Sequence, residues 1–170
     1  KKGINYGLIA ALTSPDIDNN FFEAINGEDS KKYLIGKLNL DILDGRSSIG
    51  LSSANYFKDV LEKTEIISVD NIIYGSNNLI FDYQFVQVNN KFNNKSIRGY
   101  GFSFNLDYSL SDQMFFAFSN NSYDKNFNVD KIGYLYRNNI KEYDLSVGYK
   151  IKNPLFNGLR SIDIEGEYKK

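Results

Sequence analysis

Residues 98–110, RGYGFSFNLDYSL, decide the fold class because large apolar side chains occupy every second position of this stretch. The positions between them hold glycine, serine, asparagine and aspartate. Successive side chains of an extended strand point to opposite faces, so the stretch predicts a β-strand with one apolar face and one polar face. The same alternation returns in residues 141–151, 34–42 and 162–168.

Five further segments show a weaker strand pattern, and with the four above they predict about nine strands in one domain that covers residues 1–170. These weaker segments are residues 4–12, 47–57, 66–74, 79–88 and 114–123. No amphipathic helical pattern reaches the ten to twelve residues that a packed domain helix needs, roughly, so an α/β fold is poorly supported. We therefore expect an all-β protein.

The expected links between these strands alternate in length along the chain. Turn-forming residues predict short links at 44–46, 75–78, 111–113 and 152–159, whereas longer polar links are expected at 13–32, 58–65, 89–96 and 124–140. Bacterial outer-membrane barrels place short turns on the periplasmic side and longer loops outside. The alternation favours such a barrel.

The composition excludes several classes of function. The chain has no cysteine and no histidine, so disulfides, Cys or His metal sites and catalytic Ser-His-Asp or Cys-His sets are impossible within it. Its 20 basic and 21 acidic residues nearly cancel, so the chain has no positive net charge that would attract nucleic acid. The longest purely apolar run, residues 8–12, is too short for a transmembrane helix. We expect no enzyme activity, no catalytic or metal-binding residue, no cofactor and no nucleic-acid partner.

The alternating segments resemble the strands of Gram-negative outer-membrane β-barrels over nearly the whole chain. Within residues 121–152, the motifs Ser122-Tyr123-Asp124, Arg137-Asn138 and Glu142-Tyr143-Asp144-Leu145 also resemble the last third of a proteobacterial barrel family of unknown function. The resemblance implies an antiparallel up-and-down (meander) transmembrane β-barrel, or part of one, in the bacterial outer membrane. Its implied role is structural, or pore-forming and transporting, as in porin-like proteins.

The two ends of the chain depart from this family pattern. Such barrels end in an aromatic residue, whereas this sequence ends in Tyr168-Lys169-Lys170. An odd number of strands would also leave open edges. We therefore expect a fragment of a longer chain, or a strand that the pattern does not reveal.

In a barrel the apolar rows face lipid and the polar rows line the lumen, with outer-membrane lipid as the partner. The residues expected to face lipid are Leu38, Leu40, Phe102, Phe104, Leu106, Tyr108, Leu145, Val147, Tyr149, Ile162 and Ile164. Those expected to line the lumen are Lys37, Asn39, Asp41, Asn105, Asp107, Glu142, Asp144, Lys150, Asp163, Glu165 and Glu167. Acidic residues dominate this second set, so any pore is expected to prefer cations.

The alternative is a soluble or surface-attached β-sandwich that binds a ligand or partner through its loops. Its apolar rows would face a second sheet instead of lipid. The alternation of apolar and polar residues does not distinguish the barrel from the sandwich, because both folds cover one face of the sheet. Strand length favours the barrel, since membrane strands need about 9 to 11 residues and ordinary strands have about five or six.

Overall fold

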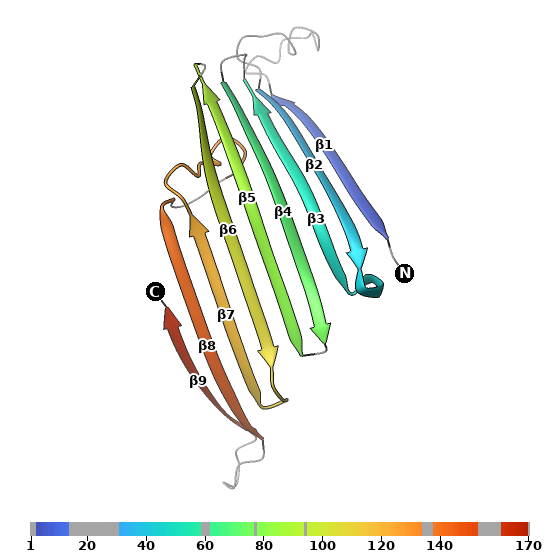
Figure 1. Ribbon diagram of the computed structural model, residues 1–170, viewed down its shortest axis with the longest axis vertical. Helices are drawn as coiled ribbons and strands as arrows, with labels where there is room; N and C mark the ends of the chain where they lie inside the picture. The colour runs from blue at the N-terminus through green and yellow to red at the C-terminus, as the bar shows by residue number, and fades with distance from the viewer. Residues whose placement is uncertain are drawn as a thin grey trace.

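The structure is a computed structural model that describes residues 3–13, 31–58, 62–76, 78–93, 95–133, 138–152 and 161–169. It shows one nine-stranded antiparallel sheet in which neighbouring strands follow one another in the sequence (Figure 1). The strands are β1 (Ile4–Thr13), β2 (Lys31–Ile42), β3 (Ser47–Phe57), β4 (Glu62–Ser76), β5 (Leu79–Phe92), β6 (Lys95–Ser109), β7 (Met114–Tyr123), β8 (Ile140–Lys152) and β9 (Ser161–Lys169). The predicted all-β meander of nine strands is confirmed. Over the described residues β1 and β9 do not pair with each other, so the sheet is open.

Three central strands are longer than the sequence pattern predicts. β4 begins at Glu62, β5 continues to Phe92 and β6 begins at Lys95. The long links expected at 58–65 and 89–96 are therefore wrong, and only 58–61 and 93–94 separate these strands. Polar side chains predominate at these strand ends, and Phe92 and Ile97 stand on the polar face, so the usual alternation is hidden. Asn93 has a φ of 47°, as a tight turn requires. Only the links at 14–30 and 124–139 remain long.

The strand register sorts the side chains onto two chemically different faces. One row across β2 to β6 holds Leu38, Leu51, Val69, Phe85 and Phe102. The chain neighbours of these five residues form a row on the opposite face, which holds Asn39, Gly50, Asp70, Gln84 and Ser103. We call these two sides of the sheet the apolar face and the polar face.

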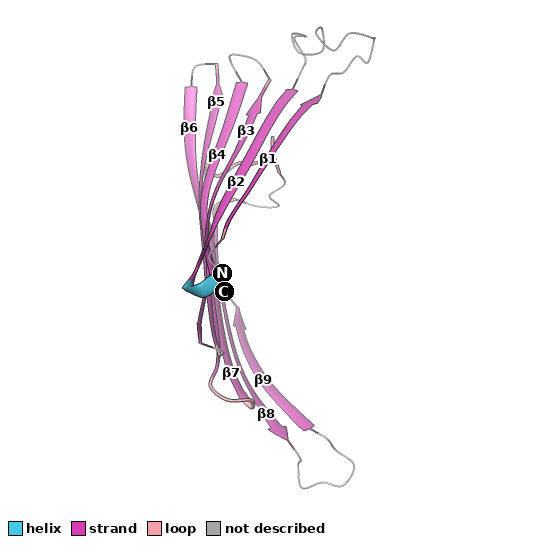
Figure 2. Cartoon of the chain, turned by 90° about the vertical axis from the view of Figure 1, so that its right-hand side faces the viewer, coloured by secondary structure: helices cyan, strands magenta, loops and turns pink. Residues whose placement is uncertain are grey.

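The sheet is curved, and the polar face lies on the concave side. Figure 2 shows the top of β1 and the bottom of β9 bending to the same side, where the link between β7 and β8 also lies. The buried hydrophobic residues among the described ones are Tyr56, Val88 and Phe127. Tyr56 and Val88 lie on the polar face, and Phe127 belongs to the covering link. The small core is therefore on the concave side, and the apolar face has no comparable cover.

Candidate functional site

The apolar face exposes large side chains from the first strand to the last. Leu8 in β1 is 73% exposed, Leu51 in β3 is 51% exposed and Val147 in β8 is 47% exposed. The largest apolar patch on a typical soluble monomer covers only a few hundred Å², roughly. A face that stays apolar across nine strands needs an apolar surrounding or partner to cover it.

Aromatic rings link neighbouring strands on this face. The ring centroids of Phe81 and Phe104 are 5.1 Å apart, and those of Phe104 and Phe118 are 5.9 Å apart, both edge-to-face. Phe85 and Tyr100 stack at 6.0 Å. Cross-strand aromatic pairs stabilise a sheet by about 0.2 to 1 kcal/mol each. These contacts hold β5, β6 and β7 together, and the outward side of the rings stays exposed.

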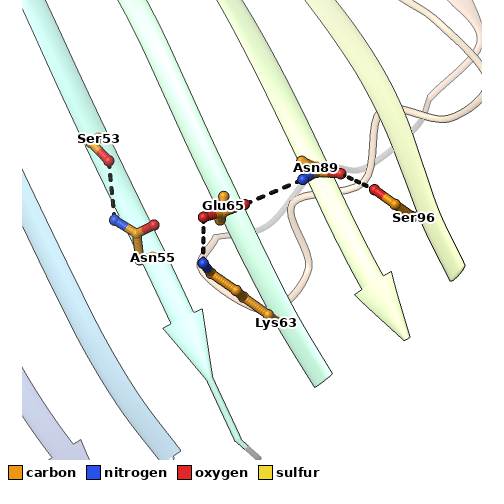
Figure 3. Close-up of polar contacts among 6 residues, drawn as sticks. All are labelled: Ser53, Asn55, Lys63, Glu65, Asn89 and Ser96. Carbon is orange, nitrogen blue, oxygen red and sulfur yellow. Dashed lines mark hydrogen bonds and ion pairs between the residues drawn. The ribbon is translucent and has the colours of Figure 1, made fainter. Parts of the chain in front are cut away.

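A belt of polar side chains closes the apolar face at one end of the strands. Figure 3 shows Asn55 donating to Ser53 over 3.0 Å, and Glu65 accepting from Asn89 over 3.2 Å. Lys63 forms an ion pair with Glu65, and the Ser96 hydroxyl donates to the Asn89 carbonyl oxygen. We call this set the polar belt: Ser53, Asn55, Lys63, Glu65, Asn89 and Ser96. The strand register places all six residues on the apolar face. The apolar part of this face therefore ends at the polar belt.

The charges of the apolar face gather at the same end. Its described charged side chains are Lys32, Lys63, Glu65, Lys91, Arg98 and Lys141. Lys63 and Lys91 are direct register partners, and the Lys63 ammonium lies 4.9 Å from the centroid of the Phe57 ring. One carboxylate therefore stands among five cationic side chains.

The polar face carries a hydrogen-bonded and mainly acidic surface. Lys37 pairs with Asp70 at 3.2 Å, and Asn105 donates to Asp82 over 2.8 Å. A hollow of about 290 Å³ is lined by Asp82, Asn105 and Asp107, together with β7 and β8 residues that include Asp144. No metal-binding cluster of acidic residues is found in the part of the chain that the structure describes. Such a surface suits contact with water.

The link between β7 and β8 folds onto the upper part of the polar face. Asp124 accepts hydrogen bonds from the backbone N–H groups of Tyr100 and Asn126, at 2.9 and 2.8 Å. Phe127 is only 4% exposed, and its ring lies where a Cβ on Gly101 would come within 2.8 Å. The glycines of the RGYG motif therefore provide space for this link.

Two polar contacts fix the far side of the same link. Asn90 donates to the Asn128 carbonyl over 2.9 Å, and Lys131 pairs with Glu62 at 2.7 Å. The hydrogen bond to the Glu62 carboxylate raises the pKa of Lys131 above its ordinary value. A hollow of about 630 Å³ remains between the link and the ends of β4 to β6. The link narrows the concave side and leaves this space open.

The register also shows where the predicted site residues lie. The apolar face holds Leu38, Leu40, Phe102, Phe104, Leu106, Tyr108, Leu145, Val147, Tyr149 and Ile164. The polar face holds Lys37, Asn39, Asp41, Asn105, Asp107, Glu142, Asp144, Lys150 and Glu167. The side chains of Ile162, Asp163 and Glu165 lie outside the described ones. Contact with lipid or with a lumen stays a prediction for both sets.

Sequence reasoning missed the polar belt and the docked link. Polar side chains dominate residues 89–96, and this composition predicts a loop there. The continued alternation of Gln87, Asn89 and Lys91 with Val86 and Val88 was the available signal for a longer strand. No local pattern indicates that Phe127 packs against Gly101, because the contact joins distant positions.

Comparison with known proteins identifies no relative of this chain. No protein-family model matches it, no curated protein matches it, and no solved structure matches it. Among the described residues, no helix is long and apolar enough to cross a bilayer.

Proposed function

We propose that this chain forms the wall of a bacterial outer-membrane β-barrel, or part of one, with a structural or pore-forming and transporting role. The observation that carries the proposal is the uncovered apolar face, which runs across all nine strands of the sheet. In a membrane, acyl chains would cover this face, and the polar concave side would line water. The strands have 9 to 15 residues, enough for a tilted membrane strand.

The extent of the apolar region supports the same proposal. In β6 the apolar positions run from Tyr100 to Leu110, just after the strand end, and Arg98 precedes them. About ten steps of ~3.3 Å give roughly 33 Å along the strand. A strand tilt of about 40° reduces this to about 25 Å, which is the height of the apolar band in outer-membrane barrels.

The β-sandwich alternative requires a second sheet over the apolar face. The described residues form a single sheet, and the link that folds back covers the polar face. The uncovered face and the strand lengths therefore favour the barrel.

Site-directed fluorescence tests the proposal directly. The chain has no cysteine, so single cysteines at Val147 and Ser146 can be labelled without background. These neighbours point to opposite faces of β8. In outer-membrane vesicles that contain the protein, a quencher attached to acyl chains is expected to quench a fluorophore at Val147 and to spare one at Ser146. Equal quenching at both positions, or no quenching at either, would contradict the proposal.

A further inference from the structure

We propose that the charged end of the apolar face binds the phosphate groups of anionic lipids in one leaflet of the membrane. We call this surface the basic rim, defined by Lys32, Lys63, Lys91, Arg98 and Lys141. The inference rests on the proposed function, because it assumes that the apolar face lies in lipid. It adds the chemistry of the partner and the end of the strands at which this partner lies.

The first argument is the position of the charges. Among the described side chains of the apolar face, all charged ones lie toward one end of their strands, beside the polar belt. In β6, Arg98 lies two residues before Tyr100, the first apolar residue of this strand on the apolar face. The Tyr100 side chain is 42% exposed. Two strand residues span about 7 Å, so a lipid whose acyl chains cover Tyr100 would hold its phosphate near the Arg98 guanidinium.

The second argument is the unfavourable pairing of like charges. Lys63 and Lys91 lie directly opposite each other on adjacent strands, an arrangement that destabilises a sheet unless an anion is present. Glu65 pairs with Lys63. Lys91 and Arg98 make no ion pair with any side chain in the described ranges. The single carboxylate of Glu65 interacts with both Lys63 and Lys91, so positive charge remains in excess. A phosphate outside the sheet would balance this excess, and a guanidinium can bind it through two hydrogen bonds.

The third argument is that the two faces carry opposite charge. The chain as a whole has a formal net charge of −1, yet the polar face is mainly acidic. The polar face also holds lysines, among them Lys37 and Lys95, but only on the apolar face do the basic side chains outnumber the acidic ones among the described residues. Each basic side chain near an anionic lipid surface contributes about a fivefold increase in affinity. The pattern predicts preference for an anionic leaflet over a zwitterionic one.

Lipid selectivity in electron paramagnetic resonance tests this proposal. The full protein is reconstituted in phosphatidylcholine vesicles with spin-labelled phosphatidylglycerol or spin-labelled phosphatidylcholine. We expect the wild type to retain the phosphatidylglycerol label more strongly. Lys91→Gln combined with Arg98→Gln removes two basic side chains and should therefore lower this preference by up to about 25-fold. The control variant, Lys95→Gln with Lys125→Gln, removes two charges from the concave side and should keep the preference.

Each other outcome has a separate meaning. If the protein holds labelled lipid without a preference for the anionic headgroup, or if both double variants lose it equally, the basic rim proposal is wrong and the barrel stands. If no lipid becomes motionally restricted, the barrel proposal fails, and the rim proposal fails with it. Inorganic phosphate should reduce the preference no more than chloride at equal ionic strength. A stronger effect of phosphate would assign the rim to free phosphate and overturn the lipid assignment.

Discussion

Gly99 in β6 lies directly beneath the backbone of the link between β7 and β8. A Cβ atom at this position would come within 2.4 Å of backbone atoms of Asn126 and Phe127. Because backbone has less freedom to move aside than the end of a flexible side chain, any larger residue at Gly99 must displace the link. The small residues of the RGYG motif therefore have a packing role, beyond completing the polar row of a strand.

We expect Gly99→Ala to loosen the docked link and to destabilise the protein by about 1 to 3 kcal/mol, the usual cost of overpacking. Urea unfolding of the protein in lipid vesicles measures the loss, and the rate of protease cleavage within residues 124–133 reports on the link. The matched control is Gly7→Ala in β1, where a Cβ would meet no atom within 4 Å. Equal behaviour of the two variants would show that the link does not pack on Gly99.

At the scale of single elements, the link between β7 and β8 is held by a combination of apolar and ionic contacts. Phe127 supplies the buried contact, and the pair of Lys131 with Glu62 fixes the outer part. The Lys131 ammonium also lies 5.8 Å from the centroid of the Tyr56 ring. Both contacts of the Lys131 ammonium depend on its charge and hence on pH, whereas the packing of Phe127 does not, so pH separates the ionic from the apolar contribution.

The raised pKa of Lys131 predicts an alkaline limit for this contact. A group whose pKa is higher in the folded state stabilises that state fully below its unfolded pKa, and the contribution disappears as pH rises through the folded pKa. Protection of the link from proteolysis should therefore be constant from neutral pH to the ordinary lysine pKa of 10.5, and should fall above it. Lys131→Gln should lack this step. A decline that begins near neutral pH, or that persists in the variant, would assign the effect to another group.

The ends of some strands, but not of others, can be predicted from the sequence. The bounds of β3 and β7 agree with the sequence prediction, because their alternation stops at clear turn residues or polar links. β4, β5 and β6 extend further through residues such as Lys63, Asn89 and Ser96, which are polar although they share the apolar face. Hydrogen bonds between adjacent strands, from Asn89 to Glu65 and from Ser96 to Asn89, stabilise the extra length.

At the scale of the whole molecule, charge is divided between the two sides of one sheet. The concave side presents Asp41, Asp70, Asp82, Asp107 and Glu142, whereas basic residues dominate the charged end of the apolar face. Fixed negative charge along a narrow aqueous path raises the local concentration of cations. Any pore formed by this wall should therefore select cations.

We expect the full protein, in a planar bilayer under a salt gradient, to give a cation-selective reversal potential. Asp82→Asn combined with Asp107→Asn should reduce the selectivity, because both carboxylates line the same hollow of the concave side. Lys91→Gln on the apolar face should leave it unchanged. An anion-selective potential, or equal effects of both changes, would contradict the assignment of the polar face to the lumen.

The order of residues along the chain is enough to predict nine strands, their meander arrangement and the sharing of faces by alternate residues. Period two is a property of the local backbone, so residues 98–110 display it without reference to distant parts of the chain. Three features come only from contacts between strands: the short links between the central strands, the curvature of the sheet, and the docking of Phe127 on Gly99 and Gly101. These features depend on side chains that meet across strands, and such contacts leave no periodic trace in the sequence.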